Sequence, residues 1–335
     1  MSTSNFPTLL AATRRAFSLE EGAALQLEPI LKGGSDRAYY RITGVQPCIL
    51  SVYGTERQEN ESFAPLTHFL AERVGVPVPQ ILAQDLKARR LWLQDLGETD
   101  LYALAQSQSE DRLKACASAL THVARLHRFP LAQTDDLGSH VQLAFDNLLY
   151  QWEQDYFFNE FVIPFSQLKE ESIASLREHP ELARLRDDLA ALPRCLVHRD
   201  FQSHNLIWHQ GQTWFIDYQG LRPGRGEYDL ASFLYDPYVD FTENERSQLL
   251  AVYQEALAQE VNPSLLRDCA LQRLMQALGA YGYLSLKKGK TAFLEHIPPA
   301  LERLRLVLAE SPLSSTPLGT LRFETLRHEP FRSSA

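Results

Sequence analysis

The sequence predicts an α+β protein of two lobes, a small β-rich N-terminal lobe over residues 1–96 and a larger, mainly helical C-terminal lobe over residues 97–335. The first observation is length, because 335 residues with 44% apolar content can bury two or three separate cores. The second is a change near Gly97, where short apolar or alternating runs give way to long segments with a helical repeat.

The N-terminal lobe is expected to consist of short strands and one helix. The strands lie at residues 25–31, 37–42, 48–53 and 90–93, each apolar or alternating and bounded by Gly, Pro or polar residues. Apolar residues recur at helical spacing between residues 59 and 74, and Gly75 follows as a stop signal. The last strand leads into residues 94–97, which we interpret as a hinge between the lobes.

Long helices are expected after the hinge, because apolar residues there keep the period of an α-helix. These helices lie near residues 110–128, 141–162, 181–191, 243–260, 264–288 and 292–309. One short β insertion interrupts them at residues 195–217. The tail after Glu310, which contains Ser and Pro, is expected to be irregular or to lie along the surface.

The composition excludes several classes of partner. Lys and Arg number 33 against 42 Asp and Glu, and the net charge of −9 gives no general attraction to nucleic acid or to an anionic membrane. An anionic ligand must therefore be held by a local site. No window approaches about 18 consecutive apolar residues and no export signal is visible, so we expect a soluble cytoplasmic protein. Nothing in the sequence indicates an obligate protein partner.

The four cysteines are widely spaced along the chain: Cys48, Cys116, Cys195 and Cys269. They have neither the paired spacing of a zinc site nor the density of a secreted disulfide scaffold. We therefore expect buried thiols in a reducing compartment.

The β insertion carries the most informative residues of the chain. Its apolar runs 206–208 and 214–216 flank a polar turn at 210–212, which predicts an antiparallel hairpin. Asn205 enters the first strand and Asp217 leaves the second, so both fall at the open end of the hairpin. Asp200 lies on the loop that leads to that end. Two carboxylates and an amide oxygen suit Mg²⁺ and a hydroxyl nucleophile better than a soft metal.

Taken singly, each of these three residues has a structural alternative, since Asp and Asn often cap turns or end strands. Their order is harder to explain in that way. His198-Arg199-Asp200, Asn205 and Asp217-Tyr218-Gln219-Gly220 follow the order H-R-D-x-x-x-x-N and D-x-x-G of phosphoryl transfer in eukaryotic-type kinases. A zinc site built on His198, His204 and His209 is disfavoured because no Cys or His partner pattern accompanies them.

On these motifs the chain resembles the aminoglycoside phosphotransferase and choline kinase-like superfamily. Leu126-His127 before the catalytic loop and Tyr228-Asp229-Leu230-Ala231 after it fall in the expected order. Within the superfamily the chain looks most like the bacterial cell-wall amino-sugar kinases, which phosphorylate the anomeric hydroxyl of N-acetylmuramate and N-acetylglucosamine. The segments that suggest this branch are 34–41, 58–60 with Phe63, 76–79 and 93–97.

The resemblance implies a two-lobed protein-kinase-like fold and an enzyme that transfers phosphate from ATP to an alcohol group. Asp200 would orient the acceptor hydroxyl and take its proton, while Asn205 and Asp217 would hold Mg²⁺ against the ATP phosphates. Alternatives are a choline- or aminoglycoside-type kinase acting on an amino alcohol, and a non-catalytic nucleotide-binding regulator. A strongly cationic acceptor calls for a dense acidic wall, which the sequence does not concentrate anywhere.

The resemblance also assigns nucleotide contacts in the N-terminal lobe. The turn Gly33-Gly34-Ser35 could cover phosphates, although a plain hairpin turn also favours Gly. Residues 49–53 lack the lysine that protein kinases carry on the third strand, and we expect Arg41 to supply the cation and Glu59 to orient it. Gln94, Asp95 and Leu96 in the hinge are expected to bind adenine through backbone groups.

The acceptor site is expected in the C-terminal lobe, facing Asp200. Residues 152–158 combine aromatic and acidic side chains, which suit sugar faces and hydroxyls, and we single out Glu153. Tyr235 and Asp236 form a second candidate. A buried helix with an acidic edge would look similar. The basic run 287–290 is interpreted as a solvated helix end.

Overall fold

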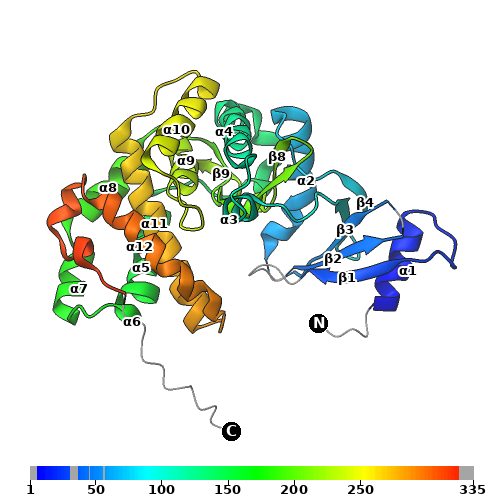
Figure 1. The fold of residues 1–335 in the computed structure, drawn as a ribbon, viewed down its shortest axis with the longest axis horizontal. Helices are drawn as coiled ribbons and strands as arrows, with labels where there is room; N and C mark the ends of the chain where they lie inside the picture. The colour runs from blue at the N-terminus through cyan, green and yellow to red at the C-terminus, as the bar shows by residue number, and fades with distance from the viewer. Residues whose placement is uncertain (1–5, 31–36, 45, 56, 324–335) are drawn as a thin grey trace, which may run out of the picture.

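The computed structural model describes residues 6–30, 37–44, 46–55 and 57–323, and it has the two lobes that the sequence predicts (Figure 1). The N-terminal lobe contains an antiparallel sheet with the strand order β1-β2-β3-β5-β4. Its strands are β1 (Gln26–Ile30), β2 (Ala38–Thr43), β3 (Cys48–Val52), β4 (Ile81–Asp85) and β5 (Arg90–Gln94). Only β4 was not predicted; it pairs with β5 alone and none of its residues is buried, so its apolar alternation is weak.

A helix that was not predicted, α1 (Phe6–Ala16), covers one face of this sheet. Leu9 is buried against a small apolar core that includes Ile42 of β2 and Trp92 of β5. The Trp92 indole Nε1–H donates to Thr13 Oγ1 at 2.9 Å, which satisfies the buried ring nitrogen. The sheet therefore has a core of its own on this side.

The other helix of the N-terminal lobe links it to the rest of the molecule. Where one helix over 59–74 was predicted, the chain runs through a 3₁₀ segment η2 (Gln58–Ser62), an α-helix α2 (Phe63–His68) and a π-helical segment η3 (Phe69–Val74). Gly75, with φ of 73°, ends it as predicted. Phe63, Leu66 and Phe69 belong to the large core of the C-terminal lobe, so this helix fastens the sheet to that lobe.

The C-terminal lobe is mainly helical, as predicted. Its helices are α3 (Leu101–Gln106), α4 (Arg112–Arg128), α5 (Asn147–Phe157) with π-helical η6 (Phe158–Val162), α6 (Ile163–Phe165), α7 (Glu170–Arg177), α8 (Pro180–Ala191), α9 (Gly226–Leu234), α10 (Glu243–Leu257), α11 (Pro263–Leu286) and α12 (Ile297–Leu308). The helix expected from residue 141 begins only at Asn147. The N–H groups of Gln142 and Phe145 instead donate to the carbonyls of Leu221 and Pro223.

Helix α11 is buried along most of its length and packs against α5, α9 and α12 (Figure 1). Two small antiparallel pairs lie beside the helices: β6 (Cys195–Val197) with β9 (Arg222–Gly224), and β7 (Leu206–His209) with β8 (Gln212–Phe215). The 3₁₀ turns are η4 (Leu131–Gln133), η5 (Asp135–His140), η7 (Ser203–Asn205), η8 (Tyr218–Gly220), η9 (Thr291–His296), η10 (Pro312–Ser315) and η11 (Pro317–Thr320).

Of the tail after Glu310, residues 311–323 pack against the surface of the lobe, with Leu313, Leu318 and Leu321 buried there, and the rest lies outside the described residues. Over the described parts of the chain, we find no helix with both the length and the apolar character needed to cross a membrane.

Candidate active site

The predicted hairpin is present as β7 and β8, with Leu206 opposite Phe215. The N–H of Ile216 donates to the carbonyl of Asn205 at 3.0 Å, which extends the pairing one step toward the open end. Asn205 and Asp217 therefore lie together at that end, as the strand pattern predicts. Asp217 has a left-handed backbone (φ 59°), which turns the chain out of the hairpin into η8.

The catalytic loop is held by a buried carboxylate on α9. Asp229, with no exposed surface, accepts hydrogen bonds from the backbone N–H groups of His198 at 2.6 Å and Arg199 at 2.8 Å. Arg199 has φ of 78°, a conformation that costs a non-glycine residue about 1 kcal/mol or more. The two hydrogen bonds to Asp229 stabilise that conformation and so fix the direction in which Asp200 leaves the loop.

Asp229 is itself held from two other helices. His127 Nε2 of α4 lies 3.1 Å from its carboxylate, and His127 Nδ1 lies 2.7 Å from the Tyr253 hydroxyl of α10. Gly226 makes this packing possible, because a Cβ there would lie 2.9 Å from His127 Nδ1. The two segments on which the resemblance rests, 126–127 and 228–231, thus meet behind the catalytic loop.

A second buried carboxylate, Asp236, holds the far end of the loop. It accepts hydrogen bonds from the N–H groups of Ser203 at 2.7 Å and Tyr238 at 2.9 Å, and only 1% of the residue is exposed. Asn205 Nδ2 donates to the carbonyl of Asp200 at 2.8 Å, which closes the loop on itself. The prediction that Asp236 contacts the acceptor is corrected, because its carboxylate is enclosed and already holds backbone N–H groups.

Asp200 lies in a basic environment. Its two carboxylate oxygens lie 3.3 Å from Arg199 and 3.8 Å from Arg273 of α11. Burial raises the pKa of Asp200, but Arg199, Arg273, His198 and Arg222 together lower it by more, so the pKa lies below its ordinary value. The side chain is therefore a carboxylate that can accept a hydrogen bond from a hydroxyl group.

Asp217 differs from Asp200 in exposure and in charge. Its side chain is 54% exposed, and Arg37 approaches one oxygen at 3.3 Å. The surrounding protein atoms and the neighbouring Asp200 raise the pKa of Asp217, and Arg37 opposes them only in part. The accessible carboxylate of Asp217 and the amide oxygen of Asn205, which accepts no hydrogen bond from any residue that the structure describes, are a donor set that fits Mg²⁺, which is usually held by one or two protein oxygens together with phosphates and water.

Arg37, which was not among the predicted site residues, lies beside Asp217. Only 5% of its side chain is exposed, and its Nε donates to Asn60 Oδ1 at 2.6 Å. Burial lowers the pKa of Arg37, but Tyr39 first, and then Asp217 and Glu59, raise it above the ordinary value. Glu59 thus acts on Arg37, while its own direct ion pair is with Arg57 at 3.5 Å.

The expected pairing of Arg41 with Glu59 is wrong. Arg41 Nε donates to Asp95 Oδ2 at 2.7 Å, and its guanidinium also binds Glu98. The reason is the strand register. Arg41 of β2 lies opposite Ile49 of β3, and β3 in turn pairs with β5, the strand that leads into the hinge. Its side chain therefore reaches the acids of the hinge.

The predicted hinge residues lie at the end of β5, with Gln94 as the last residue of the strand and Asp95 and Leu96 directly after it. The Gln94 N–H donates to the Gln80 carbonyl at 2.8 Å, and the Asp95 carboxylate accepts from the Gly97 N–H at 2.9 Å. Among the residues that the structure describes, the backbone N–H and C=O of Leu96 have no hydrogen-bond partner. The contact of Gln94, Asp95 and Leu96 with adenine stays a prediction, and Gly33, Gly34 and Ser35 lie outside the described residues.

Glu153 is not available to an acceptor. It has no exposed surface, and its carboxylate accepts from the Tyr228 hydroxyl at 2.8 Å and from Gln272 Nε2 at 3.0 Å. Burial raises its pKa, opposed by these hydrogen bonds. The alternative of a buried helix with an acidic edge is therefore correct for Glu153. Tyr235, the remaining candidate, lies against Arg246 of α10, whose guanidinium is 6.0 Å from its ring.

The cysteines and histidines have structural roles. All four cysteines are free; Cys48, Cys116 and Cys269 are buried and Cys195 is half-buried. In the described ranges no cluster of His, Cys, Asp and Glu has the make-up of a multi-residue metal site. His198 Nε2 hydrogen bonds to the Ile216 carbonyl at 3.0 Å and supports the catalytic loop.

Comparisons with known proteins identify the family and the fold of the chain. The family model described as "Phosphotransferase enzyme family" matches residues 26–265. The chain is 26% identical over 293 residues to a Pseudomonas putida protein named N-acetylmuramate/N-acetylglucosamine kinase, covering 83% of this chain and 82% of that protein. A Pseudomonas aeruginosa protein of the same name is 26% identical over 300 residues, with 86% and 85% covered.

Solved structures show the same fold at lower identity. A gentamicin complex of an aminoglycoside phosphotransferase has a TM-score of 0.63 at 16% identity, covering 91% of this chain and 98% of that one. A choline/ethanolamine kinase family protein from Mesorhizobium loti has a TM-score of 0.61 at 18% identity, covering 93% and 97%. The predicted two-lobed kinase-like fold is thus confirmed. Because the family model spans most of the sequence, the chain belongs to the phosphotransferase enzyme family.

Proposed function

We propose that this phosphotransferase uses ATP and Mg²⁺ to phosphorylate the anomeric hydroxyl of N-acetylmuramate, N-acetylglucosamine or both, in the cytoplasm, as a step in the recycling of cell-wall sugars. The observation that carries the proposal is the convergence of Asp200, Asn205 and Asp217 at one end of the β7–β8 hairpin. The names of the two Pseudomonas relatives support the choice of acceptor.

Asp200 is the residue proposed to act on the acceptor. Its carboxylate stays ionised because Arg199 and Arg273 lower its pKa, so it can accept a hydrogen bond from the anomeric hydroxyl and orient the oxygen toward the phosphate. The proton passes to Asp200 as the new P–O bond forms. The buried hydrogen bonds of Asp229 and Asp236 hold the loop rigid during this step.

Asn205 and Asp217 are proposed to hold Mg²⁺, which when bound neutralises the charge on the ATP phosphates. Arg37, beside Asp217, is proposed to take the place of the missing strand lysine, and the charge of Glu59 favours its cationic form. The unpartnered N–H and C=O of Leu96 are a donor and an acceptor that suit an adenine edge. On this proposal the nucleotide binds between the two lobes.

The charge around Asp200 argues against a cationic acceptor. Arg199 and Arg273 lie within 4 Å of its carboxylate, and both would repel choline or an aminoglycoside. A neutral or anionic sugar meets no such repulsion. A non-catalytic regulator is disfavoured because the three residues needed for chemistry are all present and held in place.

The proposal is tested by incubating the protein with MgATP and each of N-acetylmuramate, N-acetylglucosamine, choline and gentamicin, followed by phosphorus NMR of the product. We expect turnover with at least one N-acetyl sugar and phosphate on its anomeric oxygen. Phosphate on another hydroxyl would refute the anomeric assignment, and turnover only with choline or gentamicin would refute the acceptor. An Asp200→Asn variant should bind ATP without turnover, and a parent protein without turnover would identify a regulator.

A further inference from the structure

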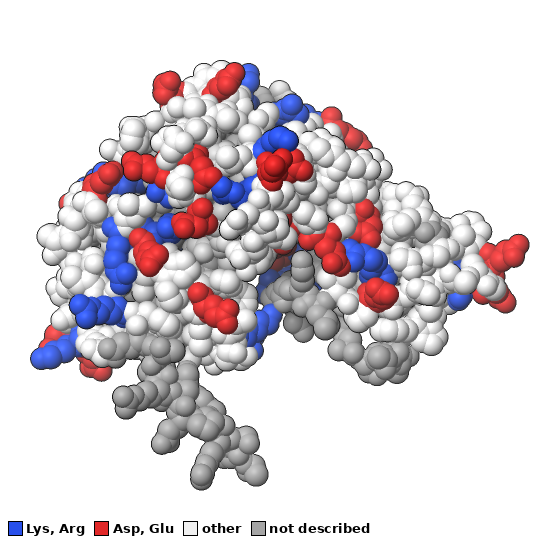
Figure 2. All heavy atoms as spheres, in the orientation of Figure 1, with Lys and Arg blue, Asp and Glu red and all other residues white. Residues whose placement is uncertain are grey.

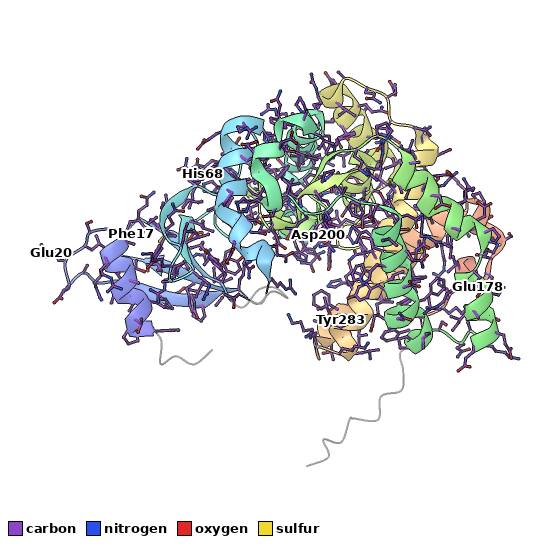
Figure 3. The ribbon with its side chains drawn as sticks, turned by 180° about the vertical axis from the view of Figure 1, so that it is seen from behind. Phe17, Glu20, His68, Glu178, Asp200 and Tyr283 are labelled. Atoms are coloured by element: carbon purple, nitrogen blue, oxygen red, sulfur yellow. The ribbon has the colours of Figure 1, made fainter. Side chains whose placement is uncertain are left out.

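Arg222 on β9 lies beside the catalytic loop, and the proposed function gives it no role. In the strand register Arg222 lies opposite Val197 of β6, and Asp200 follows Val197 by three residues. Three residues span at most about 11 Å of chain, so Asp200 and Arg222 belong to neighbouring segments of one small site. Figure 3 places Asp200 where the C-terminal lobe faces the N-terminal lobe. Figure 2 shows the surface hollowed between the lobes, with basic side chains on the wall that the C-terminal lobe forms.

A short series of contacts connects the guanidinium of Arg222 to Asp200. The Nε of Arg222 donates to the carbonyl of Gly220 at 3.0 Å. Gly220 packs directly on Arg199, because a Cβ at Gly220 would lie 3.3 Å from Arg199 Cδ. Arg199 Nη1 in turn lies 3.3 Å from the Asp200 carboxylate. The path from Arg222 to Asp200 therefore passes through only two residues.

The Nη groups of Arg222 are available to a ligand. The side chain is half-buried, and its guanidinium lies over the ring of Phe145, with Cζ 5.4 Å from the ring centroid. This stacking and the hydrogen bond to Gly220 fix the direction of the planar group. No acidic side chain of the described residues lies within ion-pair distance of Arg222. Arg222 is therefore an oriented cation at the edge of the site.

The surroundings of Asp200 carry an excess of positive charge. The guanidinium groups of Arg199, Arg273 and Arg222 all lower the pKa of Asp200. Burial and the like charge of Arg199 lower the pKa of Arg222, and the two acids that oppose this, Asp200 and Glu153, do not compensate fully. Both of these acids also lie in the field of Arg199 and Arg273, so two carboxylates face three cations. A bound anion would offset the repulsion between the arginines.

We infer that Arg222 is the specificity-determining residue of the acceptor site, and that its guanidinium binds a carboxylate on the sugar whose hydroxyl Asp200 orients. The inference rests on the proposed function. N-acetylmuramate differs from N-acetylglucosamine by an ether substituent that ends in a carboxylate. A guanidinium binds such a group through two parallel hydrogen bonds. Arg222 therefore favours N-acetylmuramate, whereas Asp200 acts on both sugars alike.

The nucleotide is the other source of negative charge near Asp200. The groups proposed to bind its phosphates, Arg37 and the Mg²⁺ ligands Asn205 and Asp217, lie together at the open end of the β7–β8 hairpin. Arg222 lies instead on β9, between β6 and the ring of Phe145. The position of Arg222 thus favours the acceptor, and the KM for ATP distinguishes the two sources.

The test measures steady-state kinetics with MgATP and each sugar for Arg222→Gln and Arg222→Lys. Arg222→Gln should raise the KM for N-acetylmuramate about tenfold or more and leave the KM for N-acetylglucosamine and for ATP within about twofold. Arg222→Lys keeps the charge but loses the planar fork, so its KM for N-acetylmuramate should lie between those of the parent and Arg222→Gln. The control is Arg184→Gln on α8, which removes the same charge from an exposed arginine paired with Glu181 and Asp188 and should change no KM.

The dependence on salt is an independent measurement of the same contact. Because the contact joins two charged groups, the parent's KM for N-acetylmuramate should rise between about 0.05 M and about 0.3 M NaCl at saturating ATP. The KM for N-acetylglucosamine, which is neutral, should rise less. Arg222→Gln should reduce the salt dependence for N-acetylmuramate.

The outcomes separate the inference from the function on which it rests. If the parent protein phosphorylates neither sugar, the proposed function fails. If it phosphorylates both and Arg222→Gln changes the two KM values equally or not at all, Arg222 does not determine specificity. Turnover of N-acetylglucosamine alone would also overturn the inference. If the parent turns over N-acetylmuramate alone, the KM for ATP is the reference, and a rise in N-acetylmuramate KM of less than about twofold overturns the inference.

Two other effects of the substitution are distinguishable from loss of the contact. A rise in the KM for ATP without a change in either sugar would assign Arg222 to the nucleotide. Loss of Arg222 also raises the pKa of Asp200, but this change affects the turnover of both sugars and leaves the ratio of their KM values unchanged. A melting curve of each variant checks that it folds, and Arg222→Lys, which keeps the charge, provides the test if Arg222→Gln does not fold.

Discussion

The two sides of the proposed active site are built differently. In the C-terminal lobe, the catalytic loop is fixed by the enclosed carboxylates Asp229 and Asp236, which bind backbone N–H groups. In the N-terminal lobe, Arg37 and Arg41 are held by side chains, and two of their partners, Asp217 and Glu98, are 54% and 72% exposed.

The difference has a physical consequence. A buried carboxylate that binds backbone N–H groups cannot change partner without leaving buried polar groups unsatisfied, so the loop keeps one conformation. An arginine paired with exposed acids loses little when it moves, because water replaces those acids. We therefore expect the C-terminal side to be preformed and the N-terminal side to reorganise around a nucleotide.

The largest expected effect is on the preformed side. Asp200→Asn removes the carboxylate that orients the acceptor hydroxyl and accepts its proton, and kcat should fall by about 10²- to 10⁴-fold. The affinity for ATP should change little, since Asp200 faces the acceptor. The measurement is single-turnover kinetics together with ATP titration. Asp240→Asn, a residue with a side chain 90% exposed, is the matched control and should retain full turnover.

The next largest effect separates the two sides by stability. Asp229→Ala leaves the buried N–H groups of His198 and Arg199 unsatisfied, and should lower the free energy of unfolding by about 3 kcal/mol and abolish turnover. Asp95→Ala, which removes the hinge partner of Arg41, should cost about 1 kcal/mol or less. Urea denaturation of both variants measures the difference. Equal losses would contradict the contrast between a fixed loop and an adaptable sheet.

The same contrast explains how much of the site the sequence could predict. Asn205 and Asp217 were predicted from local order, because a hairpin brings its two ends together. Asp200 was predicted from its place in the motif, and its position also depends on Asp229, which holds the loop. The periodic helices and most strands were predicted for a similar reason, since each carries its own apolar pattern. Strand β4 has no buried residue, so its pattern is weak.

The residues that were missed or misassigned depend on long-range packing. Glu153 and Asp236 lie in stretches of sequence that look polar and accessible. No neighbouring residue in the sequence shows that their carboxylates accept hydrogen bonds from Tyr228 and Ser203. Arg37 reaches Asp217 across 180 positions of sequence. Its one signal was its position just before β2, the neighbour of strand β3, which lacks the usual lysine. The signal for Arg273 was its positive charge within the mainly apolar helix α11.

A third prediction distinguishes the two arginines of the adaptable side. Arg37→Ala should raise the KM for ATP about tenfold, because it removes a largely buried cation beside Asp217. Arg41→Ala should raise it by about threefold or less, because Arg41 acts only through the hinge acids. Kinetics at several Mg²⁺ concentrations measure both. If Arg41→Ala raised the KM for ATP more than Arg37→Ala did, Arg41 would be the residue that replaces the missing lysine.

The smallest effect is on stability and depends on pH. Because the folded protein raises the pKa of Asp217 above its unfolded value, the ionised carboxylate opposes folding at pH values above that pKa. Asp217→Asn should therefore raise the melting temperature slightly at pH 7, even though it removes a proposed Mg²⁺ ligand and with it turnover. The gain should vanish as the pH falls toward the unfolded pKa, where the parent carboxyl is protonated.

Asp200 has a lowered pKa, so the sign is opposite: its charge favours folding at neutral pH, and Asp200→Asn should lower the melting temperature there. Melting curves of both variants test these opposite signs over a range from pH 4, which is about the pKa of an unfolded carboxyl group, up to pH 8. A melting temperature that moves in the same direction for both would mean that the two carboxylates do not differ in electrostatic environment as the structure has them.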